Sequence, residues 1–235
     1  MPDPRLVRMR TRRVLGTVLA ALGALLLLDA ALTLAWREPV TWLIDRGAQP
    51  RLERRLATLD RRFTAALGPR MPARLSAGAR MELAARALAR ETRPGDPLGR
   101  IAIPSISARF VVVEGTDPHD LRFGPGHYVP TALPGEPGTF GLAGHRTTHL
   151  QPFRSIDALR PGDAIVMTMP YGRFTYRVQG TRIVTPSDVA VLTRNGGGER
   201  IVLTACHPLY SAAQRIVVTG RLVSARALGP AAARA

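Results

Sequence analysis

Three polar side chains lie where apolar, β-rich runs begin or end, and together they could carry out acyl transfer. His145 follows the run TFGLAG, Cys206 closes the run IVLTA, and Arg215 opens the run IVVTG nine residues after the cysteine. The end of a strand holds a side chain rigidly while leaving it open to a substrate. Side chains so placed could form one site.

The residue types define the chemistry of such a site. A free thiol has a pKa of ~8.5, and a neighbouring imidazolium or guanidinium favours the thiolate. Histidine can give a proton to a departing amine and take one from an incoming nucleophile. Arginine stays charged, and its fork can hold a carbonyl oxygen or the oxyanion of a tetrahedral intermediate. The three groups together describe acyl transfer through a thioester.

The cysteine and histidine content limits the alternatives. Cys206 is the single cysteine, which excludes an internal disulfide and a multi-thiolate metal site. Taken alone, a cysteine in an apolar strand is most often an inert core thiol. His145 and His149 are four residues apart but lack a nearby carboxylate or third ligand, so we expect no metal and no cofactor. Four histidines are expected in loops or on the surface: His119, His127, His149 and His207.

The basic charge does not indicate nucleic-acid binding. The 235 residues include 33 basic and 17 acidic side chains, and every basic residue is arginine. More than half of the arginines precede Leu98, and few aromatic residues lie among the others. Nucleic-acid surfaces combine clustered basic residues with aromatic ones. We therefore expect no nucleic-acid partner.

An apolar segment at residues 14–36 follows a basic segment at residues 1–13. At ~1.5 Å per residue a helix of this length exceeds the ~30 Å of a hydrocarbon core, and a cleavable signal peptide has a shorter apolar region. Arginines before the span favour a cytoplasmic N-terminus. The sequence predicts a single-pass membrane protein with a cytoplasmic basic tail, a transmembrane helix in contact with lipid, and an extracellular remainder.

The sequence after the apolar segment divides into two regions of different composition. Residues 37–97 are rich in arginine and alanine and contain two amphipathic runs with a Pro/Gly break, which indicates a helical juxtamembrane spacer and linker. Residues 98–226 contain seven or eight short β-rich runs with no room for crossover helices, which predicts an antiparallel sandwich or barrel with short helical turns at 117–121, 152–159 and 186–192. Residues 227–235 are expected to be a disordered tail.

The order and wording of several segments resemble the sortase family of membrane-anchored cysteine transpeptidases, and within it the class E enzymes of actinobacteria. The resemblance covers residues 98–225 and implies a mainly β fold, an eight-stranded antiparallel barrel of sortase type. The strings that carry it are GPGHY (124–128), LPGEPG (133–138), LAGHRTTH (142–149), LRPGD (159–163), LTACHP (203–208) and RIVVTGRLV (215–223).

The resemblance assigns a role to each member of the trio. It implies that Cys206 is the nucleophile, His145 the general acid and base, and Arg215 the group that orients the substrate and its oxyanion. Family members usually have threonine or serine directly before the cysteine, where this chain has Ala205. Four more residues are expected to bind the substrate: Tyr128, Thr204, His207 and Tyr210.

The resemblance also implies an activity and its partners. A Leu-Ala/Pro-X-Thr-Gly type sorting signal would be cleaved after threonine, and the acyl chain passed to the amine of a cell-wall precursor. The partners would be secreted proteins bearing a C-terminal signal and a peptidoglycan stem or lipid-linked amine.

Three alternatives remain. The first is a pilin-polymerising sortase, although residues 43–97 show no aromatic-anchored lid. The second is a cysteine-dependent peptidoglycan L,D-transpeptidase, which places its arginine almost beside the cysteine, whereas eight residues intervene here. The third is an inactive wall-binding scaffold.

Overall fold

The computed structural model describes residues 4–35, 47–193 and 198–232, and the side chains of its first helix from residue 14 to residue 31. The chain divides into two compact units, Met1–Leu43 and Ile44–Ala235. Each unit is considered by itself.

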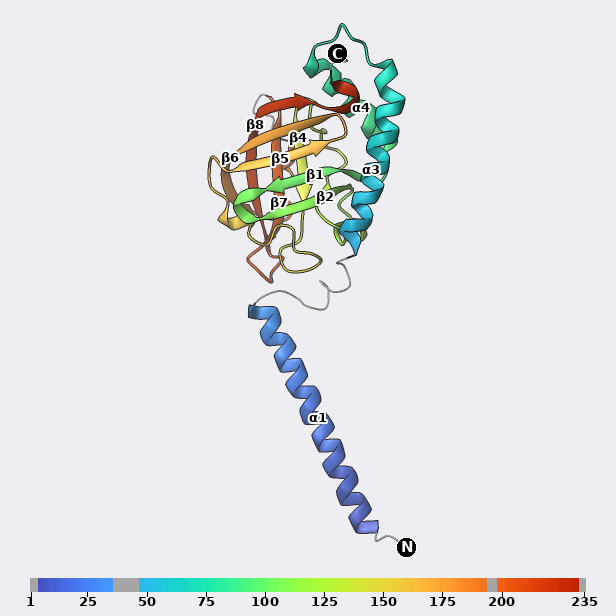
Figure 1. Ribbon diagram of the computed structural model, residues 1–235. Helices are drawn as coiled ribbons and strands as arrows, with labels where there is room; N and C mark the ends of the chain where they lie inside the picture. Colours follow the sequence, from blue (N-terminus) through green and yellow to red (C-terminus); the bar gives the residue numbers. More distant parts are fainter. Residues whose placement is uncertain (1–3, 36–46, 194–197, 233–235) are drawn as a thin grey trace. The chain divides into compact units, whose positions relative to one another are not determined.

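The described part of the first unit is a single long helix, α1, spanning Pro4–Ala35 (Figure 1). Its window Val14–Ala31 is long and apolar enough to cross a membrane, and none of that window is buried. The helix begins at Pro4, so the basic segment expected as a separate tail continues into the apolar one. Position 36, the predicted end of the span, lies outside the described residues.

The second unit is built around a closed barrel of eight strands, which confirms the predicted fold (Figure 1). The strand order is β1-β2-β3-β4-β7-β8-β6-β5, with β5 pairing back to β1. The strands are β1 (Pro97–Ile103), β2 (Ala108–Glu114), β3 (Gly126–His127), β4 (Thr139–Ala143), β5 (Ala164–Met169), β6 (Gly172–Val184), β7 (Arg200–His207) and β8 (Gln214–Ala227).

The expectation of a wholly antiparallel barrel is wrong at two places. β2 pairs with β3, and β4 with β7, in parallel. Parallel neighbours need a long connection. The connection from β4 to β7 contains β5 and β6, so two strands of the same barrel, and not a helix, link this parallel pair. This parallel pair is the one that carries the candidate site.

Along the strands, buried and partly exposed residues alternate, as expected for the wall of a barrel, except where another element covers the outer face. In β5, Ile165, Met167 and Met169 are buried and their neighbours are partly exposed. In β7, by contrast, five consecutive residues are buried. Its outward Val202 packs with Val217 of β8 and with Val191 of the short helix α6 (Ala190–Thr193), which explains why this strand is a continuous apolar run.

Two helices lie along one side of the barrel (Figure 1). They are α3 (Ala48–Leu67) and α4 (Ala77–Glu91), and the Ser76 hydroxyl caps α4 by accepting a hydrogen bond from Ala79 N at 3.2 Å. Phe63 of α3 and Leu88 of α4 belong to the main core. The predicted helices are therefore present, but they pack on the barrel instead of forming a spacer apart from it.

The segment after β8 is also ordered, contrary to the predicted tail. A 3₁₀ turn, η4, covers Gly229–Ala231, and Ala231 is fully buried in the main core. The Arg80 Nε group of α4 donates to Ala231 O at 2.8 Å. Residues 233–235 lie outside the described part.

Short helical elements complete the described part of the unit. The turns predicted at 117–121, 152–159 and 186–192 correspond to α5 (Pro118–Leu121), η3 (Ile156–Ala158) and α6. Two further 3₁₀ turns are η1 (Gly68–Arg70) and η2 (Pro104–Ile106).

Candidate active site

The cysteine and the arginine face each other across two strands. β7 and β8 pair antiparallel, and Cys206 lies directly opposite Arg215 in the register. Directly opposite residues have Cβ atoms about 5 Å apart on the same face of the sheet. The nine-residue spacing in the sequence is therefore the length of chain needed to leave β7, turn, and return beside the thiol.

The histidine reaches the thiol from the other side of β7. β4 runs parallel to β7, and their last paired residues are Ala143 and Thr204. The Gly144 N–H continues the ladder by donating to Thr204 O at 3.0 Å. His145 follows at once, so the end of β4 delivers the imidazole next to the end of β7.

All three side chains line one hollow of about 270 Å³. Each of them is half-buried, and the thiol is free. A half-buried thiol is accessible to a substrate, unlike the inert core cysteine that the residue alone would indicate. The complete lining is Thr116, Leu121, Tyr128, Ala143, Gly144, His145, Thr204, Ala205, Cys206 and Arg215.

The guanidinium of Arg215 is anchored at the turn that joins β7 and β8. Its Nη1 donates to Ala212 O and to Gln214 O, both at 3.0 Å. Two bonds to backbone carbonyls fix the head of a long side chain that would otherwise sample many rotamers. The cation is thereby held where it lines the hollow.

Two of the four expected substrate-binding residues form one wall of the hollow. The Tyr128 hydroxyl lies 2.9 Å from Thr204 Oγ1, and the Thr204 hydroxyl donates to Leu142 O at 3.4 Å. Since Thr204 uses its proton on the carbonyl, Tyr128 is the donor in the pair. Buried Ala205 stands directly before the cysteine, so that position offers no side-chain hydroxyl.

The other two expected residues, His207 and Tyr210, do not line the hollow. His207 Nδ1 lies 3.5 Å from Nη1 of Arg146. The Tyr210 side chain is 48% exposed, and its hydroxyl accepts a bond from Nη2 of Arg154 at 3.4 Å. Both residues lie in or just before the turn between β7 and β8.

A buried polar cluster behind this wall was missed by the sequence analysis. His127, expected on the surface, is 2% exposed, and its Nδ1 lies 2.8 Å from Oε1 of buried Glu114. Its Nε2 lies 2.9 Å from the Thr131 hydroxyl, which donates to Tyr128 O at 2.8 Å. The two-residue strand β3 that holds His127 gives no periodic signal, so its burial could not be seen in the sequence.

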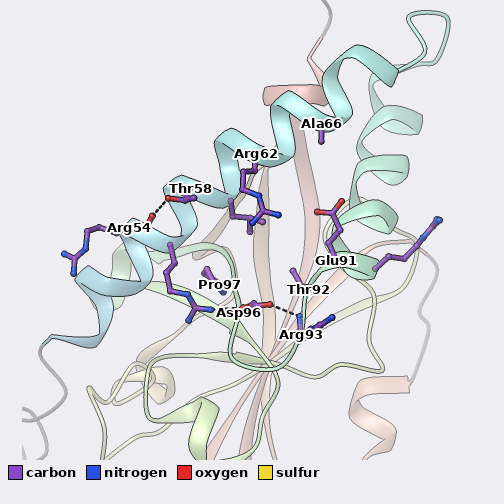
Figure 2. Close-up of a pocket in the computed structure, with 12 residues that line it drawn as sticks. Arg54, Thr58, Arg62, Ala66, Glu91, Thr92, Arg93, Asp96 and Pro97 are labelled. Atoms are coloured by element: carbon purple, nitrogen blue, oxygen red, sulfur yellow. Dashed lines mark hydrogen bonds and ion pairs between the residues drawn. The ribbon is translucent and has the colours of Figure 1, made fainter.

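Four further hollows in the described residues contain none of the trio. One is a cleft of about 740 Å³ whose rim is formed by α3, the end of α4 and the linker to β1 (Figure 2). Figure 2 shows Arg62 of α3 and Glu91 of α4 on opposite sides of this cleft. Among the described residues there is no group of three or more His, Cys, Asp or Glu side chains that could hold a metal ion.

A thiol, an imidazole and a guanidinium that share one accessible hollow form a site suited to cysteine-dependent acyl transfer. The comparison with known protein families agrees with this class. The model of the sortase domain matches residues 101–223, which is just over half of the chain. The chain belongs to the sortase family, whose members are cysteine transpeptidases.

Individual relatives belong to several sortase classes. The chain is 37% identical to sortase D of Bacillus subtilis over 133 residues, which are 55% of this chain and 66% of that protein. It is 36% identical to sortase SrtE1 of Streptomyces coelicolor over 148 residues, 57% of this chain and 42% of that one. The chain thus spans less than two thirds of these curated relatives.

The fold is also similar to a solved sortase. The crystal structure of sortase E1 from Streptomyces coelicolor, with a tripeptide in its active site, matches with a TM-score of 0.55 and 34% identity. The match covers 58% of this chain and 93% of that one.

Proposed function

We propose that this protein is a membrane-anchored, class E type sortase that attaches secreted proteins to the cell wall. It cleaves a Leu-Ala/Pro-X-Thr-Gly type signal after threonine and transfers the acyl chain to an amine of a cell-wall precursor. The observation that carries the proposal is the shared hollow of Cys206, His145 and Arg215. The similarity to SrtE1 supports class E. Because the identity to sortase D is about the same, the class is to be decided by experiment.

In the first half-reaction the Cys206 thiolate attacks the carbonyl carbon of the signal threonine. A C–S bond forms, and the negative charge on the carbonyl oxygen is held by the Arg215 guanidinium. The C–N bond to glycine then breaks, and the His145 imidazolium gives its proton to the departing amine. The products are a thioester on Cys206 and the released C-terminal peptide.

In the second half-reaction the acceptor amine attacks the thioester. The amine passes a proton to His145, the new C–N bond forms, and the C–S bond breaks to return the thiolate. His145 is then protonated and Cys206 is a thiolate, so the enzyme has returned to its starting state. The trio supplies every group that these steps require, so neither a metal nor a cofactor enters the scheme.

A second hollow beside the catalytic one supports binding of an extended peptide. It measures about 810 Å³ and shares Tyr128 with the catalytic hollow. Apolar side chains, among them Pro130 and Leu192, contribute to its lining. We place the leucine end of the signal here and the scissile bond at the thiol, with Thr204 and Tyr128 along the path.

The proposed topology follows from α1. The candidate span supports anchoring in the membrane, and the arginines before residue 14 favour a cytoplasmic N-terminus. The catalytic unit then faces the outside, where exported substrates and wall precursors meet. Tethering the enzyme beside both raises their effective concentration.

The test uses the full chain in a non-ionic detergent with a Leu-Ala-X-Thr-Gly peptide, a Leu-Pro-X-Thr-Gly peptide and a short amine acceptor. Mass spectrometry should detect the peptide–amine product. We expect Cys206→Ala to abolish it and Arg215→Lys to lower kcat by about 100-fold or more, because the bidentate fork is lost.

Arg221→Lys on the exposed part of β8 is the matched control and should leave the rate unchanged. Cleavage without amine transfer would make the protein a peptidase. Turnover of a peptidoglycan stem peptide in place of both signals would support the L,D-transpeptidase. If none of these peptides reacts in a Cys206-dependent way, the result would support the inactive wall-binding scaffold.

A further inference from the structure

Of the arginines whose side chains the structure describes, only Arg146 is fully buried, with 2% of its surface exposed. It directly follows His145. A buried guanidinium is costly unless it is both paired and hydrogen-bonded. Arg146 meets both conditions within the β4–β5 loop: Nη2 lies 2.7 Å from Asp157 Oδ2, and Nε and Nη2 each donate to Arg154 O at 3.2 Å.

The remaining nitrogen of the fork reaches a different part of the chain. Nη1 of Arg146 lies 3.5 Å from Nδ1 of His207, the residue directly after Cys206. A guanidinium can only donate, so Nδ1 is the acceptor in this contact. One side chain therefore joins the residue after the proposed general acid to the residue after the proposed nucleophile.

This contact lies where the strand ladder has ended. The pairing of β4 with β7 stops at Ala143 and Thr204, and the backbone bond from Gly144 to Thr204 is one step further. His145 and Cys206 both lie beyond these bonds. The Arg146–His207 contact continues the connection between the two segments by side chains.

We propose that Arg146 is a positioning residue for the reaction, acting through His207 to hold His145 and Cys206 at reacting distance. The inference rests on the proposed function, because that function makes the distance matter. Misplacement of reacting groups by about 1 Å can lower a rate by about 100-fold. A residue that only stabilised the β4–β5 loop would change the amount of folded enzyme and leave turnover by each active thiol as it was.

The test is a double-mutant cycle in the full chain, with Arg146→Met, His207→Leu and both together. Rates are expressed per active thiol, counted by alkylation with iodoacetamide. We expect each single variant to lower kcat by about tenfold or more while KM changes by less than about threefold. The double variant should be no slower than the slower single variant, because both changes break the same contact. If the reduction in kcat of the double variant equals the product of the two single reductions, the proposal is overturned.

Three further variants separate positioning from folding. Asp157→Asn removes the ion pair but leaves the contact with His207, so it should lower the melting temperature and keep kcat within about threefold. His207→Asn retains an acceptor oxygen near the place of Nδ1 and should recover part of the rate lost in His207→Leu. Arg146→Lys keeps the charge without the fork, and wild-type kcat in this variant would contradict the proposal even if Arg146→Met fails to fold.

Failure of the proposed function has a different signature. In that case the wild-type chain gives no product that depends on Cys206. The alkylation rate of Cys206 still reports on the site, because thiol reactivity depends on neighbouring charge. If Arg146 acts through His207, the effect of His207→Leu on that rate should disappear in the Arg146→Met background, and an undiminished effect there would overturn the positioning role.

Discussion

Replacing Gly144 with alanine tests how tightly the segment that carries His145 is packed. A Cβ at this position would meet three ring atoms of Phe153, Cδ2 at 2.5 Å, Cε2 at 2.8 Å and Cγ at 3.0 Å. Carbon atoms in contact are normally about 3.5–4.0 Å apart. Phe153 is fully buried in the main core, so its ring has no open space into which to move.

The clash has a predictable size and direction. Forcing a methyl group into a packed core costs about 1–3 kcal/mol. For a protein of this size that is a fall in melting temperature of about 3–10 °C. Because relief requires the backbone to move at Gly144, His145 moves with it, and turnover should fall by about tenfold or more.

The assay is thermal unfolding together with peptide transfer, measured on the full chain in detergent. Gly180→Ala on β6 is the matched control, since no heavy atom lies within 4 Å of its added Cβ. That variant should be as stable as wild type and as active. Phe153→Leu should restore part of the stability lost in Gly144→Ala. If Gly144→Ala matches wild type in both measurements, the close packing at the site is refuted.

Two further predictions concern buried carboxyl groups. His127→Leu leaves Glu114 buried without its partner and should cost about 3–5 kcal/mol in chemical denaturation, whereas His119→Leu, at a side chain that is 75% exposed, should stay within about 0.5 kcal/mol. Burial raises the pKa of Glu199 from 4.5, against the opposing hydrogen bond from Tyr176. The folded state thus prefers the protonated acid, and this contribution to stability is present below pH 4.5 and lost as pH rises through the higher folded value. Glu199→Gln cannot ionise, so its melting temperature should rise relative to wild type between about pH 4 and pH 7; an unchanged difference across that range would contradict the assignment.

The sequence was informative wherever a strand has a clear period or a clear end. The seven or eight β-rich runs expected over residues 98–226 agree with the eight strands of the barrel, seven of which are five residues or longer. Cys206 and Arg215 could be expected near each other because a short connection between two strands makes them antiparallel neighbours. Placing His145 beside them needed the family resemblance, because fifty-six residues separate β4 from β7.

The parallel pairs could not be inferred from local patterns. Strand direction depends on which strands become neighbours, and β4 and β7 become neighbours only after β5 and β6 have been placed elsewhere in the barrel. The two-residue strand β3 is too short for any period. It nevertheless brings buried His127 next to Glu114, a contact that cannot be predicted from the spacing of the two residues in the sequence.

Arg146 shows a different limit of sequence reasoning. The chain has 33 basic residues, all arginine, so one more beside a histidine carries no signal. Its importance appears only from its burial and from its contact with His207, sixty-one positions away. A composition biased toward one residue type conceals the few members that are held in a defined geometry.

The packing partner of helices α3 and α4 also could not be predicted from the sequence. Their apolar positions form stripes, Leu52, Leu56 and Phe63 on α3 and Met81, Ala85 and Leu88 on α4, and a stripe must be buried against something. The sequence specifies the stripe but not its partner, so a spacer and a pair of helices packed on the barrel have the same pattern. Since Phe63, Met81 and Leu88 share one core with the barrel, removing the helices would expose that core to water. The unit that holds the candidate site therefore includes α3 and α4, and a fragment that starts at Leu98 lacks part of the core around that site.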